Sequence, residues 1–353
     1  MLFQNLIIIL RPDLICFKSG FFIFKLKTKI SMKFVLSVLG LLLVTACGTK
    51  QNTSVGKEDA VEKITITSQD VKVSMDYLAS DELGGRATGS KGIEKAAVYI
   101  ENYFKKNGIK PYFETYRDSF KLGEIDGYNI VGVIEGTDDQ LKNEFIILGG
   151  HYDHIGKGKT VEGDSIANGA NDDASGTIAA MEFGRYFSKS KSNKRSILIT
   201  LYDAEEMGLK GSAHLASKLK EAGLNAYTMI NFEMIGVPRA EDKSMAYMSG
   251  YDRSNFAPTL NKYAGEEIIG FFPKAKDFQL FYRSDNFPFF KELNIPAHAI
   301  STFDFTNFEY YHHVDDEADK MDYEHMANFI NKMIPALEGM MNSNTKEVVL
   351  NEE

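Results

Sequence analysis

The sequence predicts an α/β fold in which a largely parallel β-sheet is covered by helices on both faces. Runs of β-branched and other apolar residues of strand length alternate with helical patterns through the middle of the chain. The runs are apolar almost throughout, which is typical of strands buried on both faces. The chain has 353 residues, of which 44% are apolar and 25% charged, so it can bury a sizeable core and is not disordered.

Each expected element has a local reason. Apolar residues recur at helical spacing over 68–80, and Gly84-Gly85 then breaks the pattern. Ser90 is placed to cap a second helix, which Gly108 stops. The remaining expected elements are strands over 128–134, 144–148, 195–202 and 226–231, and helices over 177–187 and 207–219.

The N-terminal region has the layout of a secretory signal. From Met32, a lysine precedes an apolar run that ends in Val44-Thr45-Ala46-Cys47, which resembles the lipobox of bacterial lipoproteins. The alternative is an ordinary apolar helix that ends near an unrelated cysteine. The lipoprotein interpretation divides the chain into a mis-assigned extension (1–31), a signal peptide (32–46), a lipidated Cys47 with a flexible tether (47–65), a folded domain (66–342) and a disordered tail (343–353).

Composition also bears on partners and location. A net charge of −9 argues against nucleic acid as a partner. The only cysteines are Cys16 and Cys47, so a chain that starts at Met32 forms no intramolecular disulfide. A lipid on Cys47 would tether the protein to a membrane of the cell envelope, on the outer-membrane, periplasmic or surface side. The sequence carries no signal for the oligomeric state.

Five short segments combine histidines with carboxylates, which are the side chains that bind zinc. Several follow expected strands, and the carboxyl ends of parallel strands meet at one edge of a sheet. We therefore expect a metal site there, with ligands for two zinc ions that share one carboxylate, and metal-assisted hydrolysis as its chemistry. The segments are GGHYDH (149–154), GANDDASG (169–176), YDAEEMG (202–208), NFEMIG (231–236) and YYHHVDD (310–316).

Individual residues suggest a division of roles. Asp153 lies two residues after His151, so in extended chain it shares a face with His151 and could accept its spare N–H. Glu205 and Glu206 are adjacent and cannot point the same way, so one can bind metal while the other acts as general base. His154 is expected in a supporting or structural role. No segment alone establishes a metal site, because each also fits a structural feature, such as a packed histidine, an Asx turn or a charged helix N-terminus.

In this order and at these separations, the segments resemble the M28 family of zinc peptidases over about residues 68–340. The resemblance implies a three-layer α/β sandwich with a central, mostly parallel mixed sheet and helices on both faces, the zinc-exopeptidase fold. The segments that match family motifs are Gly149 to Asp153, Asp172 to Gly176, Ala204 to Ser212, Asn231 to Gly236 and Tyr311 to Asp316.

The resemblance also implies a role for each site residue. It implies His151 and Glu233 on one zinc, Glu206 and His312 on the other, Asp172 bridging both, Glu205 as general base, Asp153 orienting His151, and Tyr311 steadying the tetrahedral oxyanion. The chain departs from the usual pattern in three places: Glu233 replaces the commoner Asp, His313-Val314 replaces Thr-Pro, and Asn286 stands where His usually follows Ser-Asp.

The expected function is that of a two-zinc exopeptidase acting on peptides, with an aminopeptidase favoured. Three alternatives remain open: a carboxypeptidase of the same family, a glutaminyl cyclase with one zinc, and a binding module without catalysis. The full set of five ligands favours an enzyme over the binding module, and over the single-zinc cyclase.

Overall fold

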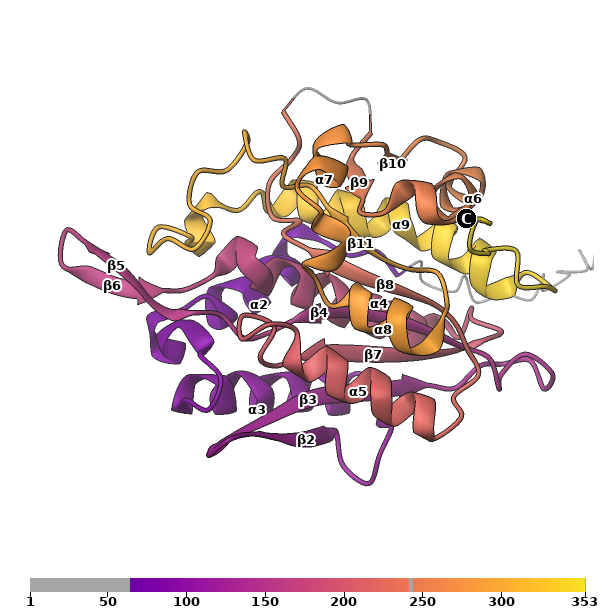
Figure 1. Cartoon of the computed structure of the whole chain (residues 1–353), viewed down its shortest axis with the longest axis horizontal. Coiled ribbons are helices and arrows are strands. Elements are labelled where there is room, and N and C mark those ends of the chain that lie inside the picture. The colour runs from indigo at the N-terminus through magenta and orange to yellow at the C-terminus, as the bar shows by residue number, and fades with distance from the viewer. Residues whose placement is uncertain (1–63, 241–243, 353) are drawn as a thin grey trace, which may run out of the picture. The chain divides into compact units, whose positions relative to one another are not determined.

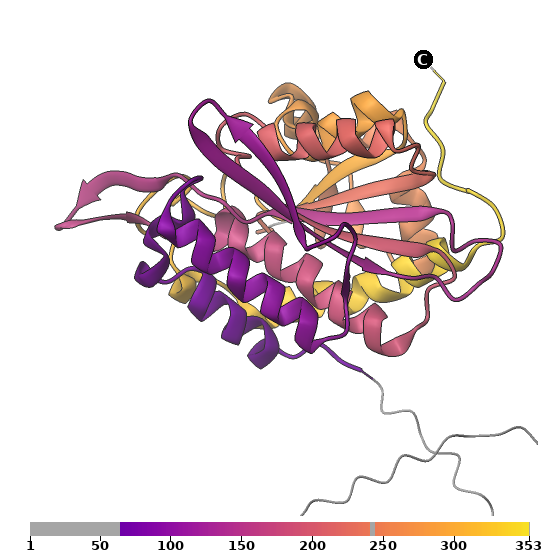
Figure 2. The ribbon, with the colours of Figure 1, turned by 90° about the horizontal axis from the view of Figure 1, so that it is seen from below.

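The computed structural model describes residues 64–240 and 244–352. These residues form three layers, with a nine-stranded mixed sheet in the middle (Figure 1). Helices α2, α3, α4 and α9 lie on one face of the sheet, and α5 and α8 lie on the other (Figure 2). The predicted three-layer α/β architecture is therefore confirmed.

The elements that build these layers follow in chain order. The strands are β1 (Lys110–Pro111), β2 (Arg117–Leu122), β3 (Ile125–Ile134), β4 (Phe145–His151), β5 (Gly156–Val161), β6 (Asp164–Ala167), β7 (Ser196–Tyr202), β8 (Ala226–Glu233), β9 (Ala246–Met248), β10 (Ile269–Gly270) and β11 (Ala297–Ser301). The α-helices are α2 (Ser68–Leu78), α3 (Lys91–Lys106), α4 (Gly176–Ser190), α5 (Lys210–Glu221), α6 (Phe256–Ala264), α7 (Pro273–Asp277), α8 (Asn286–Leu293) and α9 (Tyr323–Asn342).

The order of strands in the large sheet is β1-β3-β7-β4-β8-β11-β9-β10, and β2 pairs with the outer part of β3. The four central strands β7, β4, β8 and β11 run parallel to one another. Antiparallel pairing begins on either side of them, at β3 and at β9. The carboxyl ends of four neighbouring strands therefore meet at one edge, where ligands bind in open α/β sheets.

The core is divided between the two faces of the sheet. Ile146 and Leu148 of β4 point into one apolar cluster, whereas Ile147 between them points into the other. This alternation follows from the two-residue period of a strand. All seven residues of β7 are buried, as expected for a strand with helices on both sides.

Local sequence signals explain most helix ends. The Ser90 hydroxyl accepts a hydrogen bond from the Ile93 amide at 3.2 Å, which confirms the predicted cap of α3. Gly108, just after that helix, has a φ of +74°. Helix α5 begins at Lys210, three residues later than expected. The delay arises because Ala204 and Leu209 have positive φ angles and form a non-helical turn before the helix.

Two features differ from the sequence-based expectations. The β5–β6 hairpin was not anticipated. The tail after Met341 was expected to be frayed, and for residues 343–352 this was wrong. The Val348 amide donates to the Tyr227 hydroxyl at 2.7 Å, and Leu350 pairs with Ser254 in a β-bridge. Val348 is only 2% exposed, so the short apolar run inside this polar tail anchors it to the domain.

The expectations for the extension, the signal peptide, Cys47 and nearly all of the tether fall on residues outside those described. Among the described residues, no helix is both long and apolar enough to cross a membrane.

Candidate metal centre

The five predicted segments come together at the carboxyl edge of the central strands. His151 and Glu233 are the last residues of the neighbouring strands β4 and β8. Glu206 follows β7, and His312 lies between β11 and α9. Asp172 lies in the irregular helical turn Ala170–Ser175 that leads into α4, and its peptide bond to Asp173 is cis.

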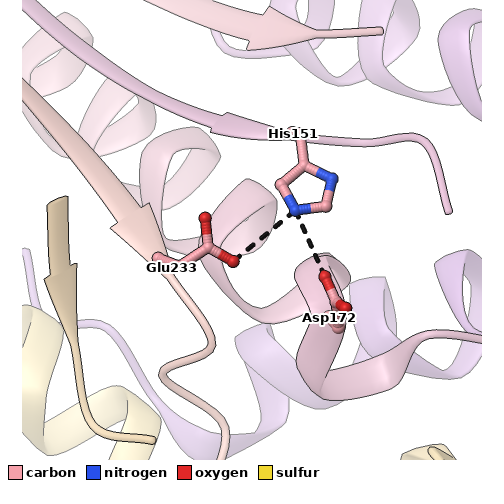
Figure 3. A group of neighbouring side chains, drawn as sticks. All are labelled: His151, Asp172 and Glu233. Carbon is pink, nitrogen blue, oxygen red and sulfur yellow. Dashed lines mark ion pairs between the residues drawn. The ribbon is translucent and has the colours of Figure 1, made fainter. Parts of the chain in front are cut away.

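The first group of side chains consists of His151, Asp172 and Glu233. The Nε2 atom of His151 lies 3.2 Å from Oδ1 of Asp172 and 3.6 Å from Oε1 of Glu233 (Figure 3). The Nδ1 atom of the same ring lies 3.1 Å from the backbone carbonyl of Asp153. Because a carbonyl can only accept, Nδ1 donates this hydrogen bond, and Nε2 is the nitrogen that faces the carboxylates.

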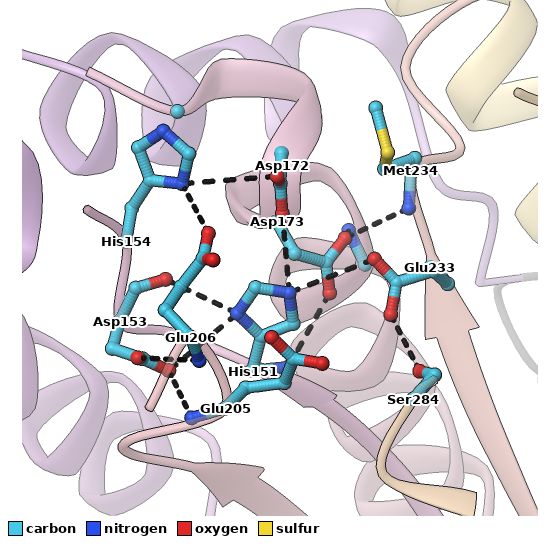
Figure 4. A network of polar contacts seen from close by, with 12 residues as sticks. His151, Asp153, His154, Asp172, Asp173, Glu205, Glu206, Glu233, Met234 and Ser284 are labelled. Atoms are coloured by element: carbon cyan, nitrogen blue, oxygen red, sulfur yellow. Dashed lines mark hydrogen bonds and ion pairs between the residues drawn. The ribbon is translucent and has the colours of Figure 1, made fainter. Parts of the chain in front are cut away.

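A second group is formed around the other oxygen of Asp172. His312 Nε2 lies 3.3 Å from Asp172 Oδ2 and 3.1 Å from Glu206 Oε2. His154 Nδ1 lies 2.9 Å from Glu206 Oε1 and 3.9 Å from Asp172 Oδ2 (Figure 4). The expectation that His154 only supports the site from outside does not match this geometry, because its ring points into the cluster. Asp172 turns one oxygen toward each group, as a bridging carboxylate does.

The spacing and burial of these atoms fit metal binding. Two atoms bound to the same tetrahedral zinc at about 2.0–2.1 Å lie about 3.3 Å apart. The distances between His151, His312 and their carboxylate partners span 3.1 to 3.6 Å. Asp172 Oδ2 and Glu206 Oε1 are buried without a hydrogen-bond partner among the described residues. A buried unpaired carboxylate oxygen is costly, and a cation would remove that cost.

Buried carboxylates outside the two groups hold the backbone of the site. Asp173 accepts hydrogen bonds from the amides of Met234 at 2.9 Å and Gly176 at 3.0 Å, and from that of His151 at 3.3 Å. Asp316 accepts from the amides of Asn171 at 2.7 Å and Asp172 at 3.0 Å. Sequence analysis missed both roles.

Asp153 binds a different partner from the one expected. Its Oδ1 accepts from the Glu205 amide at 3.1 Å, and its Oδ2 accepts from the Glu206 amide at 3.3 Å. The distance from Oδ1 to His151 Nδ1 is 3.5 Å, longer than the bond that this nitrogen makes to the Asp153 carbonyl. Asp153 therefore orients His151 mainly through its backbone, while its carboxylate fixes the turn that carries Glu205 and Glu206.

A fully buried cation, Arg86, lies behind the two loops of the site. Its guanidinium donates to four backbone carbonyls, those of Tyr152 at 2.8 Å, Leu78 at 2.6 Å, Asn168 at 2.5 Å and Gly169 at 2.8 Å. It thus ties the loop after β4 to the loop that carries Asp172. The sequence around Gly84-Gly85-Arg86 predicts the end of a helix, but it does not indicate that Arg86 is buried and binds backbone carbonyls.

The electrostatics reflect crowded, buried charges. Burial raises the pKa of Glu205 well above its usual range, although His151 opposes the shift. Burial also acts to raise the pKa of Asp172, but the neighbouring rings of His151 and His312 outweigh it and hold that pKa below its usual range. The carboxylates of Asp172 and Glu206 beside the ring raise the pKa of His312 to about 10. A cation bound between these side chains would compete with protons for the histidine nitrogens, so metal binding should weaken as the pH falls.

A cavity of about 120 Å³ opens beside the first group. Its polar wall includes His151, Asp172, Glu205 and Glu233, and the opposite wall is largely apolar, with Leu280, Phe303 and Phe305. Tyr311 also lines it, and its ring stacks on that of His312 with centroids 4.0 Å apart. A larger hollow of about 720 Å³ near Arg253 contains none of the clustered ligands, so the smaller cavity is the candidate site.

Two of the three departures from the family pattern, Glu233 and Asn286, have hydrogen-bond partners that define their positions, and of the two only Glu233 lines the cavity. Glu233 is held by Ser284, whose hydroxyl donates to Oε2 at 2.6 Å, which leaves Oε1 to face His151. Asn286 is buried, and its side-chain amide donates to the backbone carbonyl of Phe281 at 3.1 Å, so in this chain it supports the backbone.

Comparisons with known proteins agree with this geometry. Probable zinc metalloproteases of two Pyrenophora species match this chain at 37% identity. The match to the protein from P. tritici-repentis covers 32% of this chain and 25% of that relative. The match to the protein from P. teres f. teres covers 52% of this chain and 34% of that relative. The chain thus spans a quarter to a third of these relatives. A probable leucine aminopeptidase of Trichophyton verrucosum is 26% identical, with 67% of this chain and 61% of the relative covered.

Solved structures share the fold. The LapA aminopeptidase of Legionella pneumophila has a TM-score of 0.60 at 24% identity, with 79% of this chain and 73% of that chain covered. A glutaminyl cyclase of Fimbriiglobus ruber has a TM-score of 0.62 at 20% identity, with 78% and 96% covered. The sequence model of peptidase family M28 matches residues 129–337, well over half of the chain. The chain therefore belongs to peptidase family M28.

Proposed function

We propose that this protein is a zinc-dependent exopeptidase that removes N-terminal residues from peptides. The observation that carries the proposal is the pair of side-chain groups that share Asp172, one oxygen facing each group. In the proposed arrangement, His151 and Glu233 would hold one zinc, Glu206 and His312 would hold a second, and Asp172 would offer one oxygen to each. When bound, zinc supplies a water of lowered pKa and polarises the scissile carbonyl.

Glu205 has the properties of the general base. Its carboxylate lines the cavity with His151 and Asp172, and its backbone is fixed by Asp153. The raised pKa of Glu205 favours accepting a proton from the attacking water, which the same carboxyl then delivers to the leaving amine. Tyr311 borders the same cavity and is placed to donate its hydroxyl to the oxyanion that develops at the carbonyl.

The size and charge of the cavity support exopeptidase action. A volume of about 120 Å³ beside the metal-binding side chains is of the size of one substrate side chain. The carboxylates of Glu205 and Glu233 can attract the α-ammonium group of a peptide. The apolar wall formed by Leu280, Phe303 and Phe305 favours an apolar N-terminal residue.

The proposal is tested with amino-acid p-nitroanilides, N-blocked peptides and C-terminally free peptides, each with and without a chelator. We expect hydrolysis of unblocked apolar substrates that chelation abolishes and zinc restores. Glu205→Gln should lower kcat by at least about 100-fold while the zinc content stays unchanged. Activity restricted to C-terminal residues would indicate a carboxypeptidase instead.

One alternative has its own support, the fold shared with the glutaminyl cyclase of Fimbriiglobus ruber. Cyclisation of an N-terminal glutamine by a protein that binds one zinc, with no hydrolysis of p-nitroanilides, would establish this alternative. Failure of every substrate to react, with zinc still bound, would indicate a binding module.

We further propose that Cys47 is lipidated and tethers the domain to a membrane of the cell envelope. The lipobox-like sequence before Cys47 supports this proposal. Detergent phase partitioning of the protein expressed in bacteria tests it: the wild-type chain should enter the detergent phase and Cys47→Ala the aqueous phase. Equal partitioning of both would refute it.

A further inference from the structure

We propose that His154 is a sixth metal-binding residue, so that the two metal sites have unequal numbers of protein ligands. This inference rests on the proposed metal-dependent function and adds to it. His154 belongs to none of the ligand pairs that the family resemblance implies, and the sequence alone predicts only a supporting or structural role for it.

The first argument is position. The His154 ring is almost completely buried, at 1% exposure, and Nδ1 lies 2.9 Å from Glu206 Oε1 (Figure 4). This nitrogen also lies 3.9 Å from Asp172 Oδ2. These two distances bracket the separation of about 3.3 Å expected for two ligands of one zinc. His154, Asp172 and Glu206 therefore present three ligand atoms to a common point.

The second argument is the lack of hydrogen bonds at these atoms. Within the described part of the chain, neither nitrogen of His154 has a hydrogen-bond partner, and the same holds for Glu206 Oε1 and Asp172 Oδ2. Nδ1 and Oε1 are thus in close contact without the alignment of a hydrogen bond. Buried polar atoms are seldom left unpaired, whereas several of them converging on one point are satisfied by a shared cation.

The third argument is that the backbone holds the ring in place. Gly169 packs against the ring, and a Cβ at that position would lie 2.5 Å from His154 Cγ. The His154 amide donates to the carbonyl of Arg86 at 3.3 Å. The ring meets that of His312 edge to face, with centroids 5.7 Å apart. Only glycine fits at residue 169, because any side chain there would collide with the His154 ring in its present orientation.

With His154 included, the two sites differ. One site would use His154, Glu206 and Asp172, with His312 as a fourth side chain through its contacts to the same two carboxylates, whereas the other would use His151, Glu233 and the shared Asp172. Zinc sites with four protein ligands are closed, and sites with three keep a position for water or substrate. The ion at the His154 site should therefore be the tightly held one, and the ion beside His151 the exchangeable one that binds substrate.

Zinc titration of the metal-free protein tests the inference without reference to activity. Calorimetry with a competing chelator should resolve two sites in the wild type. His151→Ala should lose the weaker site and keep the tight one. His154→Ala should weaken the tight site by at least about 100-fold, since even residues that only support a ligand alter affinity 10- to 100-fold. His214→Ala is the matched control, because this partly exposed histidine pairs with Asp118 and should leave both affinities unchanged.

A measurement on the wild type guards against a variant that fails to fold. X-ray absorption of the protein with one equivalent of zinc should show two imidazole ligands, those of His154 and His312. One imidazole, or His154→Ala with two sites of wild-type affinity, would overturn the role of His154 and leave the proposed function intact. A wild type that binds no zinc would overturn both.

Discussion

Replacing Arg86 with methionine should destabilise the domain and loosen its metal centre. The side chain of methionine fills part of the space but donates nothing, so four buried carbonyls lose the donor that they share. Leaving one buried acceptor without its donor costs about 1–3 kcal/mol, so the loss at four carbonyls, partly offset by removal of the desolvated charge, should total about 3–5 kcal/mol. With about 2–4 °C per kcal/mol for a domain of this size, the melting temperature of the metal-free protein should fall by roughly 10 °C.

The assay is thermal unfolding of wild type and Arg86→Met, each with chelator and with excess zinc. Zinc should raise the melting temperature of the variant less than that of the wild type, because Arg86 joins the loops that carry His154 and Asp172. The matched control is Arg117→Met, whose side chain is 28% exposed and pairs with Glu94 and Glu101. Because this network is partly exposed to solvent, its loss should cost less than the loss of the fully buried contacts of Arg86. If Arg86→Met melts within 2 °C of Arg117→Met, the reasoning is refuted.

Three further predictions concern the bridge, a buried histidine and the mouth of the cavity. Asp172→Ala should bind neither ion tightly, and elemental analysis that finds two zinc ions after dialysis would exclude the bridging role. Burial lowers the pKa of His298 to about 4, so the stability that depends on its neutral form is complete above the unfolded pKa of about 6.5 and is lost as the pH falls to 4. His298→Gln should therefore make the free energy of unfolding in urea depend less on pH between 6.5 and 4. An unchanged pH dependence would contradict this. Arg283 is exposed at the cavity and its side chain has no partner among the described residues, so it could bind the free carboxylate of a dipeptide substrate. Arg283→Gln should then raise KM about tenfold for dipeptides and leave KM for p-nitroanilides unchanged. Equal effects on both substrates would show that Arg283 does not contact the carboxylate.

Much of the central fold could be predicted because local patterns and tertiary structure agree there. The strand that ends at His151 carries no polar side chain before that residue, and all of its residues after Phe145 are buried. Strands after residue 231 were harder to predict, because short strands such as β9 and β10 have too few residues to show the two-residue alternation of apolar and polar side chains. The docked tail was missed for a related reason, since the burial of Val348 depends on a partner, Tyr227, that is distant in sequence.

The candidate site likewise has residues whose positions could be predicted from the sequence and one residue whose position could not. Its ligands could be placed at one sheet edge because parallel strands put their carboxyl ends together. The position of His154 could not be predicted. In an extended strand, residues three apart face opposite sides, so His154 should point away from His151. Strand β4 ends at His151, however, and the chain then turns, which brings the His154 ring back to Glu206.

The metal centre draws its side chains from segments spread from β4 to the loop before α9. His312 is the last of them in the chain and reaches Asp172 and Glu206 only when β11 has joined the sheet beside β8. A nascent chain that has left the ribosome only as far as β8 thus holds an incomplete centre. The full set of side chains that could bind metal is therefore expected only once the segment that carries His312 has been synthesised and folded.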